Sequence, residues 1–152
     1  MKLAAIISTV IAFVSQYSGT PMTQAEAQAK LEAAGVYASS PGGCTTRSNP
    51  ECTSYEGILS GTVDGIIDLK EACECAITIT GGTELIRHAG GTYKYRHENG
   101  YRVDIRSVPE LDTYVKSSFT KIGNRRDGYP QWKSAEGNIY CDEGDHWDVV
   151  YY

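Results

Sequence analysis

The sequence predicts an α+β fold, with one domain in which helices pack on a small antiparallel sheet. Its 152 residues are the length of one ordinary domain and leave room for one hydrophobic core. Helical segments come first, helices mixed with strands follow, and the end of the chain is rich in hairpin signals. Elements arranged in this order favour α+β over a parallel α/β sheet.

Three segments have the features of helices. Residues 23–34 consist of strong helix formers, with Thr23 able to cap the start and Gly35 able to end the helix. Residues 55–72 space their apolar side chains near the helical period despite several internal glycines. Residues 109–119 begin with proline and carry acidic side chains in the first turn, which is typical of a helix start.

The predicted strands are short. Residues 76–80 and 101–105 alternate β-branched or aromatic residues with polar ones, and a glycine-rich loop joins them. A small antiparallel sheet is expected to close the chain, from residues 120–122, 131–133, 138–141 and 147–152. Residues 36–52 lack an apolar period and are rich in turn formers, so they predict a loop.

The start of the chain is typical of a secretory signal peptide. A lysine precedes an apolar run over residues 3–14, and small polar residues follow. The run is too short for a comfortable membrane span, and a core helix in this place would usually carry a polar face. The expected product is a secreted, extracellular protein. Its predicted parts are a signal peptide at 1–19 and one domain at 20–152, divided into a helix-and-cysteine-loop part at 20–53 and a core at 54–152.

Five cysteines in an exported chain of this size imply disulfides. A bond between Cys44 and Cys52 would hold the predicted loop, but the sequence does not determine connectivity, and an odd count leaves one thiol over. A cysteine zinc site is disfavoured, because no C-x-x-C pair exists and Cys73 and Cys75 are only two residues apart.

The overall charge excludes two classes of partner. A net charge of −5 and a pI near 5.2 give no general attraction to nucleic acid or to an anionic membrane surface. Small neutral or cationic partners are therefore expected. The protein is also expected to be a monomer.

Candidate chemistry lies in two segments that hold all the histidines. His88 and His97 fall before the strand at 101–105, and His97 is separated from Asp104 by a turn containing Gly100. Such a turn allows a loop imidazole and a strand carboxylate to converge on one ion.

The second segment is E-G-D-H-W-D near the end of the chain. It brings Glu143, Asp145, His146 and Asp148 close together in sequence. A hydrolytic zinc site requires three protein ligands, an open position for water and a nearby base, and the two segments together contain these residue types.

The H-x-x-G-x-x-x-D spacing from His97 to Asp104 resembles the signature of the D-Ala-D-Ala carboxypeptidase and L-alanyl-D-glutamate endopeptidase family, whose fold is shared with the hedgehog signalling domain. The resemblance covers the chain from about residue 55 to the end. It implies a hedgehog-type fold with His97 and Asp104 as zinc ligands. One departure is Tyr95, which replaces a serine common in the family.

In that family a later E/D-x-W-H element supplies the catalytic base and the third zinc ligand. Here Asp145 matches the base and Trp147 matches the aromatic residue, but Asp148 stands where the family has its histidine. The replacement leaves three interpretations. Asp148 ligates the metal through oxygen, His146 ligates instead with Glu143 as base, or the site has decayed into a binding site.

The candidate substrate-binding residues are His88, Arg96 and Trp147, since an imidazole, a guanidinium and an aromatic ring near the site could each contact a peptide. Several arginines crowd the same region, and any of them could bind a substrate carboxylate through two parallel hydrogen bonds. Strand alternation places Arg102 and Arg106 on the face of Asp104.

The leading hypothesis is a secreted zinc peptidase that acts on peptidoglycan-type peptides containing D-amino acids. It assigns His97, Asp104 and Asp148 as metal ligands and Asp145 as the base. The alternative is a non-catalytic secreted binding protein or effector on the same scaffold, and a third possibility is an accidental likeness. The state of Asp148 distinguishes the peptidase from the binding protein. Bound zinc supports the enzyme, and a salt-bridged Asp148 with an empty site supports the binding protein.

Overall fold

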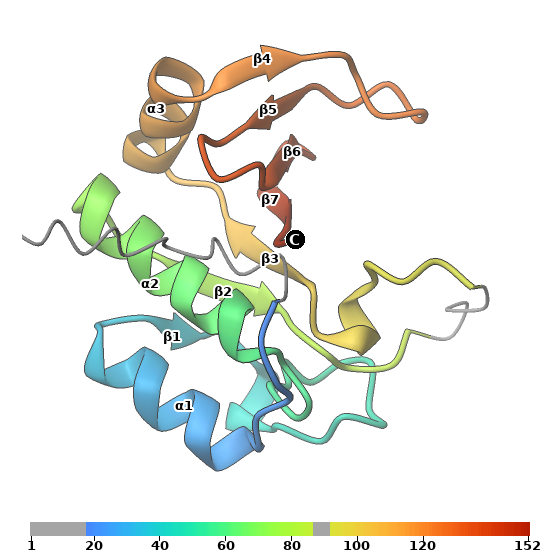
Figure 1. Ribbon diagram of the computed structural model, residues 1–152. Helices are drawn as coiled ribbons and strands as arrows, with labels where there is room; N and C mark the ends of the chain where they lie inside the picture. The colour runs from blue at the N-terminus through green and yellow to red at the C-terminus, as the bar shows by residue number, and fades with distance from the viewer. Residues whose placement is uncertain (1–17, 87–91) are drawn as a thin grey trace, which may run out of the picture.

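The computed structural model describes residues 18–86 and 92–152. The helices are α1 (Gln24–Ala33), α2 (Ser60–Cys73) and α3 (Pro109–Ser118), with short 3-10 turns η1 (Pro41–Gly43) and η2 (His97–Asn99). The strands are β1 (Tyr37–Ala38), β2 (Thr78–Gly81), β3 (Arg102–Arg106), β4 (Thr120–Ile122), β5 (Gln131–Lys133), β6 (Ile139–Asp142) and β7 (His146–Val150). This content confirms the α+β class (Figure 1).

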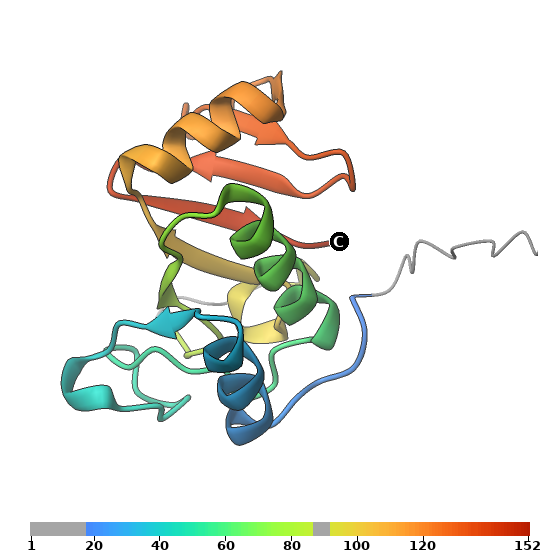
Figure 2. The same ribbon diagram turned by 90° about the vertical axis from the view of Figure 1, so that its left-hand side faces the viewer.

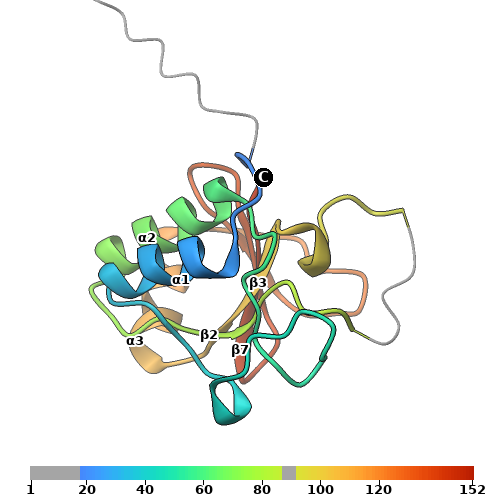
Figure 3. The same cartoon turned by 90° about the horizontal axis from the view of Figure 1, so that it is seen from below.

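The strands form one sheet in the order β1-β2-β3-β7-β6-β5-β4. The three helices line up along one face, with α1 near the β1 end and α3 near the β4 end (Figure 2). Loops lie on the other face, as the view along the sheet shows (Figure 3). We call this second face the open face, because no α-helix covers it in the described part of the chain.

The sheet is mixed, whereas the sequence predicted an antiparallel one. β1 runs parallel to β2, and all the other pairs are antiparallel. β1 was not predicted at all, because its two residues are both exposed and show no alternation of apolar and polar side chains. The backbone pairing with β2 is what makes this segment a strand.

The central strands divide their side chains between the two faces. The helix-facing side chains are apolar and buried, and on β3 and β7 they are Val103, Ile105, Trp147 and Val149. Most of the side chains of β3 and β7 on the open face are polar or ionisable, and these include Arg102, Asp104, His146 and Asp148. This alternation confirms that Arg102 shares the face of Asp104.

The helix predictions hold with one correction. Thr23 caps α1 in a capping box with Glu26, which satisfies backbone donors at the helix start. α2 begins at Ser60 and not at residue 55. Gly57 has φ of 82°, outside the helical range, and Leu59 is extended, so the buried residues before α2 pack as a loop.

Disulfides join Cys44 to Cys52 and Cys73 to Cys75, and Cys141 is a buried free thiol.

Most of the predicted signal peptide lies outside the described residues. Of its last two residues, Ser18 is buried, and its carbonyl accepts a hydrogen bond of 2.7 Å from the backbone N–H of Gly61 in α2. Within residues 18–86 and 92–152, no helix has the length and apolar character needed to cross a membrane.

We predict that Trp147→Ala lowers the free energy of unfolding by about 3–5 kcal/mol, the usual cost of truncating a buried aromatic side chain. Trp147 is 0% exposed, packs edge-on against Trp132 and donates a 2.7 Å hydrogen bond to Asp112. Urea denaturation measures the change. Tyr37→Ala is the control: its side chain is 57% exposed, so the change should stay within about 0.5 kcal/mol. Equal effects of the two substitutions would contradict the assignment of the core.

Candidate metal centre

Pairing between β3 and β7 brings two carboxylates together on the open face. Asp104 is directly opposite Asp148 in the register of the two strands. The imidazole of His97, from η2, faces both of them. Its Nε2 lies 3.4 Å from Asp104 Oδ1 and 3.8 Å from Asp148 Oδ1. The three residues predicted as metal ligands are therefore clustered in space.

A backbone carbonyl orients the ring of His97. His97 Nδ1 lies 3.2 Å from the carbonyl oxygen of Gly82, and because a carbonyl only accepts, Nδ1 carries the proton of the neutral ring. Nε2 then has a free lone pair directed at the carboxylates. A histidine that binds a metal usually makes this kind of bond through its other nitrogen.

Two glycines allow the close approach of the chain segments that carry these residues. Gly100 has φ of 84°, and an added Cβ would lie 2.6 Å from the carbonyl oxygen of Gly57. A Cβ on Gly81 in β2 would lie 2.5 Å from Asp104 Oδ2. The glycine in the predicted motif thus has a steric role, and β2 forms one wall of the site.

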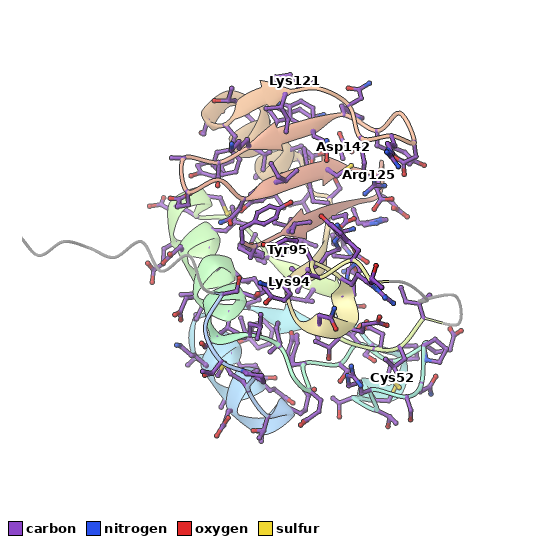
Figure 4. All side chains as sticks on the ribbon, turned by 45° about the vertical axis from the view of Figure 1, so that its right-hand side comes forward. Cys52, Lys94, Tyr95, Lys121, Arg125 and Asp142 are labelled. Atoms are coloured by element: carbon purple, nitrogen blue, oxygen red, sulfur yellow. A yellow bond between two sulfur atoms is a disulfide. The ribbon has the colours of Figure 1, made fainter. Side chains whose placement is uncertain are left out.

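Among the described residues, one carboxylate oxygen of Asp148 accepts hydrogen bonds and the other accepts none. Its side chain is only 6% exposed, and Oδ2 accepts hydrogen bonds from Arg102 at 3.2 Å and from Arg125 at 2.9 Å. Arg125 reaches the strand from the loop between β4 and β5 (Figure 4). Oδ1, the atom nearer His97, is buried without a hydrogen-bond partner among the described residues. Leaving a carboxylate oxygen unpaired in a buried place is costly, so Oδ1 is suited to receive a cation.

The surroundings of Asp104 shift the pKa of its carboxyl group upward. Burial raises its pKa; the nearby His97 lowers it and the charge of Asp148 raises it further, and the result is a pKa of about 6. A cation at this place would offset the desolvation of the carboxylate.

A second group of possible ligands shares Asp104 and adds Glu143 and His146. His146 Nε2 lies 3.8 Å from Asp104 Oδ1 and 3.0 Å from Glu143 Oε2, while Nδ1 lies 2.6 Å from Asp145 Oδ1. Burial alone would lower the pKa of His146, but the hydrogen bond to Asp145 and the charges of Asp104 and Glu143 raise it above its usual value. Carboxylates therefore already engage both ring nitrogens of His146.

The first group fits a zinc ion better than the second. Its donor atoms are one imidazole nitrogen and two carboxylate oxygens, all within 4.8 Å of one another. Zinc bonds of about 2.0–2.2 Å in a tetrahedral arrangement separate neighbouring ligand atoms by roughly 3.3–3.6 Å, near the spacings of His97 from Asp104 and Asp148. Asp148 also offers an oxygen without a hydrogen bond, whereas His146 would have to give up a carboxylate partner.

Among the described residues, Trp147, Asp145 and Arg96 do not belong to the group formed by His97, Asp104 and Asp148. Trp147 is on the helix face, because in an extended strand it must point away from its neighbours His146 and Asp148. The side chain of Asp145 is 93% exposed, and its hydrogen bond to His146 lowers its pKa. Arg96 forms an ion pair with Glu98 in η2. His88 lies outside the described residues.

A cavity of about 210 Å³ opens beside the metal-ligand group. It reaches from His97 and Asp104 along β2 to the loop held by Cys44 and Cys52, and the rest of its lining is Pro50, Thr80, Gly81, Gly82, Glu84 and Ile86.

Cys141 does not belong to the metal-ligand groups among the described residues. Burial raises the pKa of its thiol to about 11, so the thiol stays protonated at neutral pH.

Sequence reasoning did not identify Gly82 and Arg125 as parts of the site. Gly82 acts through its backbone carbonyl, which leaves no trace in residue type. Arg125 belongs to a loop 23 residues before its partner Asp148, and no periodic pattern connects the two. Only the three-dimensional packing reveals these contacts.

Comparison with protein-family models, curated proteins and solved structures finds no match for this chain. The description of the site therefore depends on the geometry of this chain alone.

We predict that Gly100→Ala destabilises the fold by about 1–3 kcal/mol, because alanine at φ of 84° is strained and its Cβ would meet the carbonyl of Gly57. Chemical denaturation measures the loss. Gly123→Ala is the matched control, since no atom lies within 4 Å of the added Cβ and its φ is not positive. A cost for Gly100→Ala no larger than that of the control would contradict the steric role of the turn.

Proposed function

We propose that this protein is a secreted, zinc-dependent peptidase of the hedgehog-type fold that acts on peptidoglycan-type peptides containing D-amino acids. The observation that carries the proposal is the convergence of His97 Nε2 and the carboxylates of Asp104 and Asp148 on the open face. The buried Oδ1 of Asp148, which accepts no hydrogen bond from the described residues, supports a cation as its partner. The H-x-x-G-x-x-x-D resemblance supports zinc and the substrate class.

Each side chain has a separate role in this proposal. His97, Asp104 and Asp148 would hold the ion, which supplies Lewis acidity toward a peptide carbonyl and activates water. The carbonyl of Gly82 fixes the tautomer of His97, and Arg102 and Arg125 fix the carboxylate of Asp148.

The base that takes a proton from the attacking water must have a carboxylate oxygen close to the metal ligands. Asp145 matches the family motif in sequence, but its side chain points to solvent. Glu143 lies at the cluster, with Oε2 on His146 and Oε1 on Arg125. We therefore favour Glu143 as the proton acceptor and as the group that returns the proton to the leaving amine.

A non-catalytic binding protein is the second candidate. The observation that favours it is the pair of arginines on Asp148. Arg102 and Arg125 neutralise much of the negative charge that would otherwise attract a metal ion. In this alternative the open face and its cavity bind a ligand without cleaving it.

We predict that metal-free wild-type protein binds one zinc ion per chain in calorimetric titration, and that His97→Ala weakens the affinity by at least about 100-fold through loss of a direct ligand. Gly81→Ala should also weaken it, since its Cβ would displace Asp104, whereas Gly123→Ala should not. Asp148→His should strengthen binding because imidazole suits zinc. Absence of zinc from the wild type, with zinc and activity gained by Asp148→His, would instead establish a decayed site used for binding.

We predict that the zinc-loaded protein cleaves peptidoglycan peptides with D-Ala-D-Ala ends or L-Ala-D-Glu bonds, and that a chelator removes this activity. Glu143→Gln should lower kcat by about 10²–10⁴-fold, the usual contribution of a general base, and Asp145→Asn by less than about tenfold. Product analysis by mass spectrometry measures both. The reverse order of effects would assign the base to Asp145, and no turnover by zinc-loaded wild type would reject the peptidase.

A further inference from the structure

The disulfide between Cys73 and Cys75 closes a very small ring at the end of α2. Only Glu74 separates the two cysteines, and their Cα atoms are 5.2 Å apart. Glu74 has φ of 49° and ψ of 37°, and within the described residues it is the one non-glycine with positive φ. A left-handed backbone brings Cβ close to the following carbonyl oxygen, so a glutamate in this conformation costs free energy.

The two disulfides differ in what they contribute to the fold. Closing a chain loop stabilises the folded protein more when the loop is longer, in the chain-entropy description. Cys44 and Cys52 are eight residues apart and hold a loop with little regular structure, whereas Cys73 and Cys75 are two apart. The bond between Cys73 and Cys75 thus gains less from ring closure and includes a strained residue. Both properties make a disulfide easier to reduce.

A backbone donor favours negative charge on the sulfur atom of Cys73. The backbone N–H of Cys75 donates to Cys73 Sγ at 3.3 Å, and the ammonium of Lys70 lies 2.8 Å from the carbonyl oxygen of Cys75. The N–H donor on Cys73 Sγ stabilises the thiolate that Cys73 becomes when the second exchange step releases it. Cys73 is partly exposed at the helix end, whereas Cys75 is 7% exposed, so an external thiolate reaches Cys73 first.

We propose that Cys73 and Cys75 form a thiol–disulfide exchange site that accepts two electrons from an external dithiol, while the Cys44–Cys52 bond is structural. The attacking thiolate forms a bond to Cys73 Sγ as the Cys73–Cys75 bond breaks, and Cys75 leaves as a thiolate that takes a proton from water. The second thiol of the dithiol then loses its proton and attacks the other sulfur atom of the dithiol, which is bonded to Cys73 in the mixed disulfide. It releases Cys73 as a thiolate, which is protonated, and the dithiol becomes a disulfide.

The fold is expected to survive this reduction. Leu69 in α2 and Ile77 just before β2 are buried in the core on either side of the ring. Reduction therefore frees Glu74 to leave its left-handed conformation without removing the contacts that hold α2 on the sheet.

The test equilibrates the full protein in buffers of reduced and oxidised dithiothreitol, traps thiols by alkylation and identifies each cysteine by mass spectrometry. The Cys73–Cys75 bond should be half reduced at a ratio of reduced to oxidised reagent at least about tenfold lower than the Cys44–Cys52 bond. For a two-electron couple this factor equals about 30 mV. Circular dichroism should show a folded protein at that ratio. Equal ratios, or earlier reduction of the Cys44–Cys52 bond, would overturn the proposal.

Two variants at Glu74 test whether its left-handed backbone makes the Cys73–Cys75 bond easier to reduce. Glu74→Gly should make the bond about fivefold or more harder to reduce, because glycine adopts the left-handed backbone without the steric cost. Glu74→Gln removes the charge, keeps the Cβ and should shift the ratio by less than about twofold. An unchanged ratio in Glu74→Gly would overturn the role assigned to the left-handed residue, and an equal shift in both variants would attribute the effect to charge.

Discussion

The antiparallel pairing of β3 with β7 is the constraint on which the rest of the structure depends. Its register sets Asp104 opposite Asp148 and, one residue along, Ile105 opposite Trp147. Because strand side chains alternate, the same pairing places two carboxylates on the open face and two apolar side chains under the helices. A slip of one residue would exchange these sets, burying charge and exposing a tryptophan, so the core and the candidate site specify each other.

Burial and ion pairing then define the character of the site. Two arginines hold one oxygen of Asp148, and the other oxygen is buried beside His97 without a hydrogen bond in the described structure. The negative charge of Asp148 is thus only partly compensated by its arginine partners. The carboxylate of Asp148 has two guanidinium partners on one oxygen, and its other oxygen is an unused acceptor that a cation would satisfy. This balance is why the same geometry supports a metal-dependent enzyme and, as the second candidate, a binding protein.

Local sequence features predicted the elements well where one physical cause dominates. The capping residue Thr23 and the helix formers after it fix α1 without help from the rest of the chain. Prediction was wrong where tertiary context decides. The two exposed residues of β1 become a strand only by pairing with β2, and the positive φ of Gly57 delays the start of α2. The bond between Cys73 and Cys75 was likewise beyond sequence reasoning, because spacing does not determine connectivity.

The sequence by itself determined the α+β class and the candidate ligands His97, Asp104 and Asp148, because strand alternation and motif spacing are local properties of the chain. Only the tertiary structure decided how those ligands are supported. The carbonyl of Gly82 and the guanidinium of Arg125 reach the site from distant segments, and Trp147 turns to the core while its neighbours face the ligands. Long-range packing sets these contacts, and residue types along the chain do not encode them one by one.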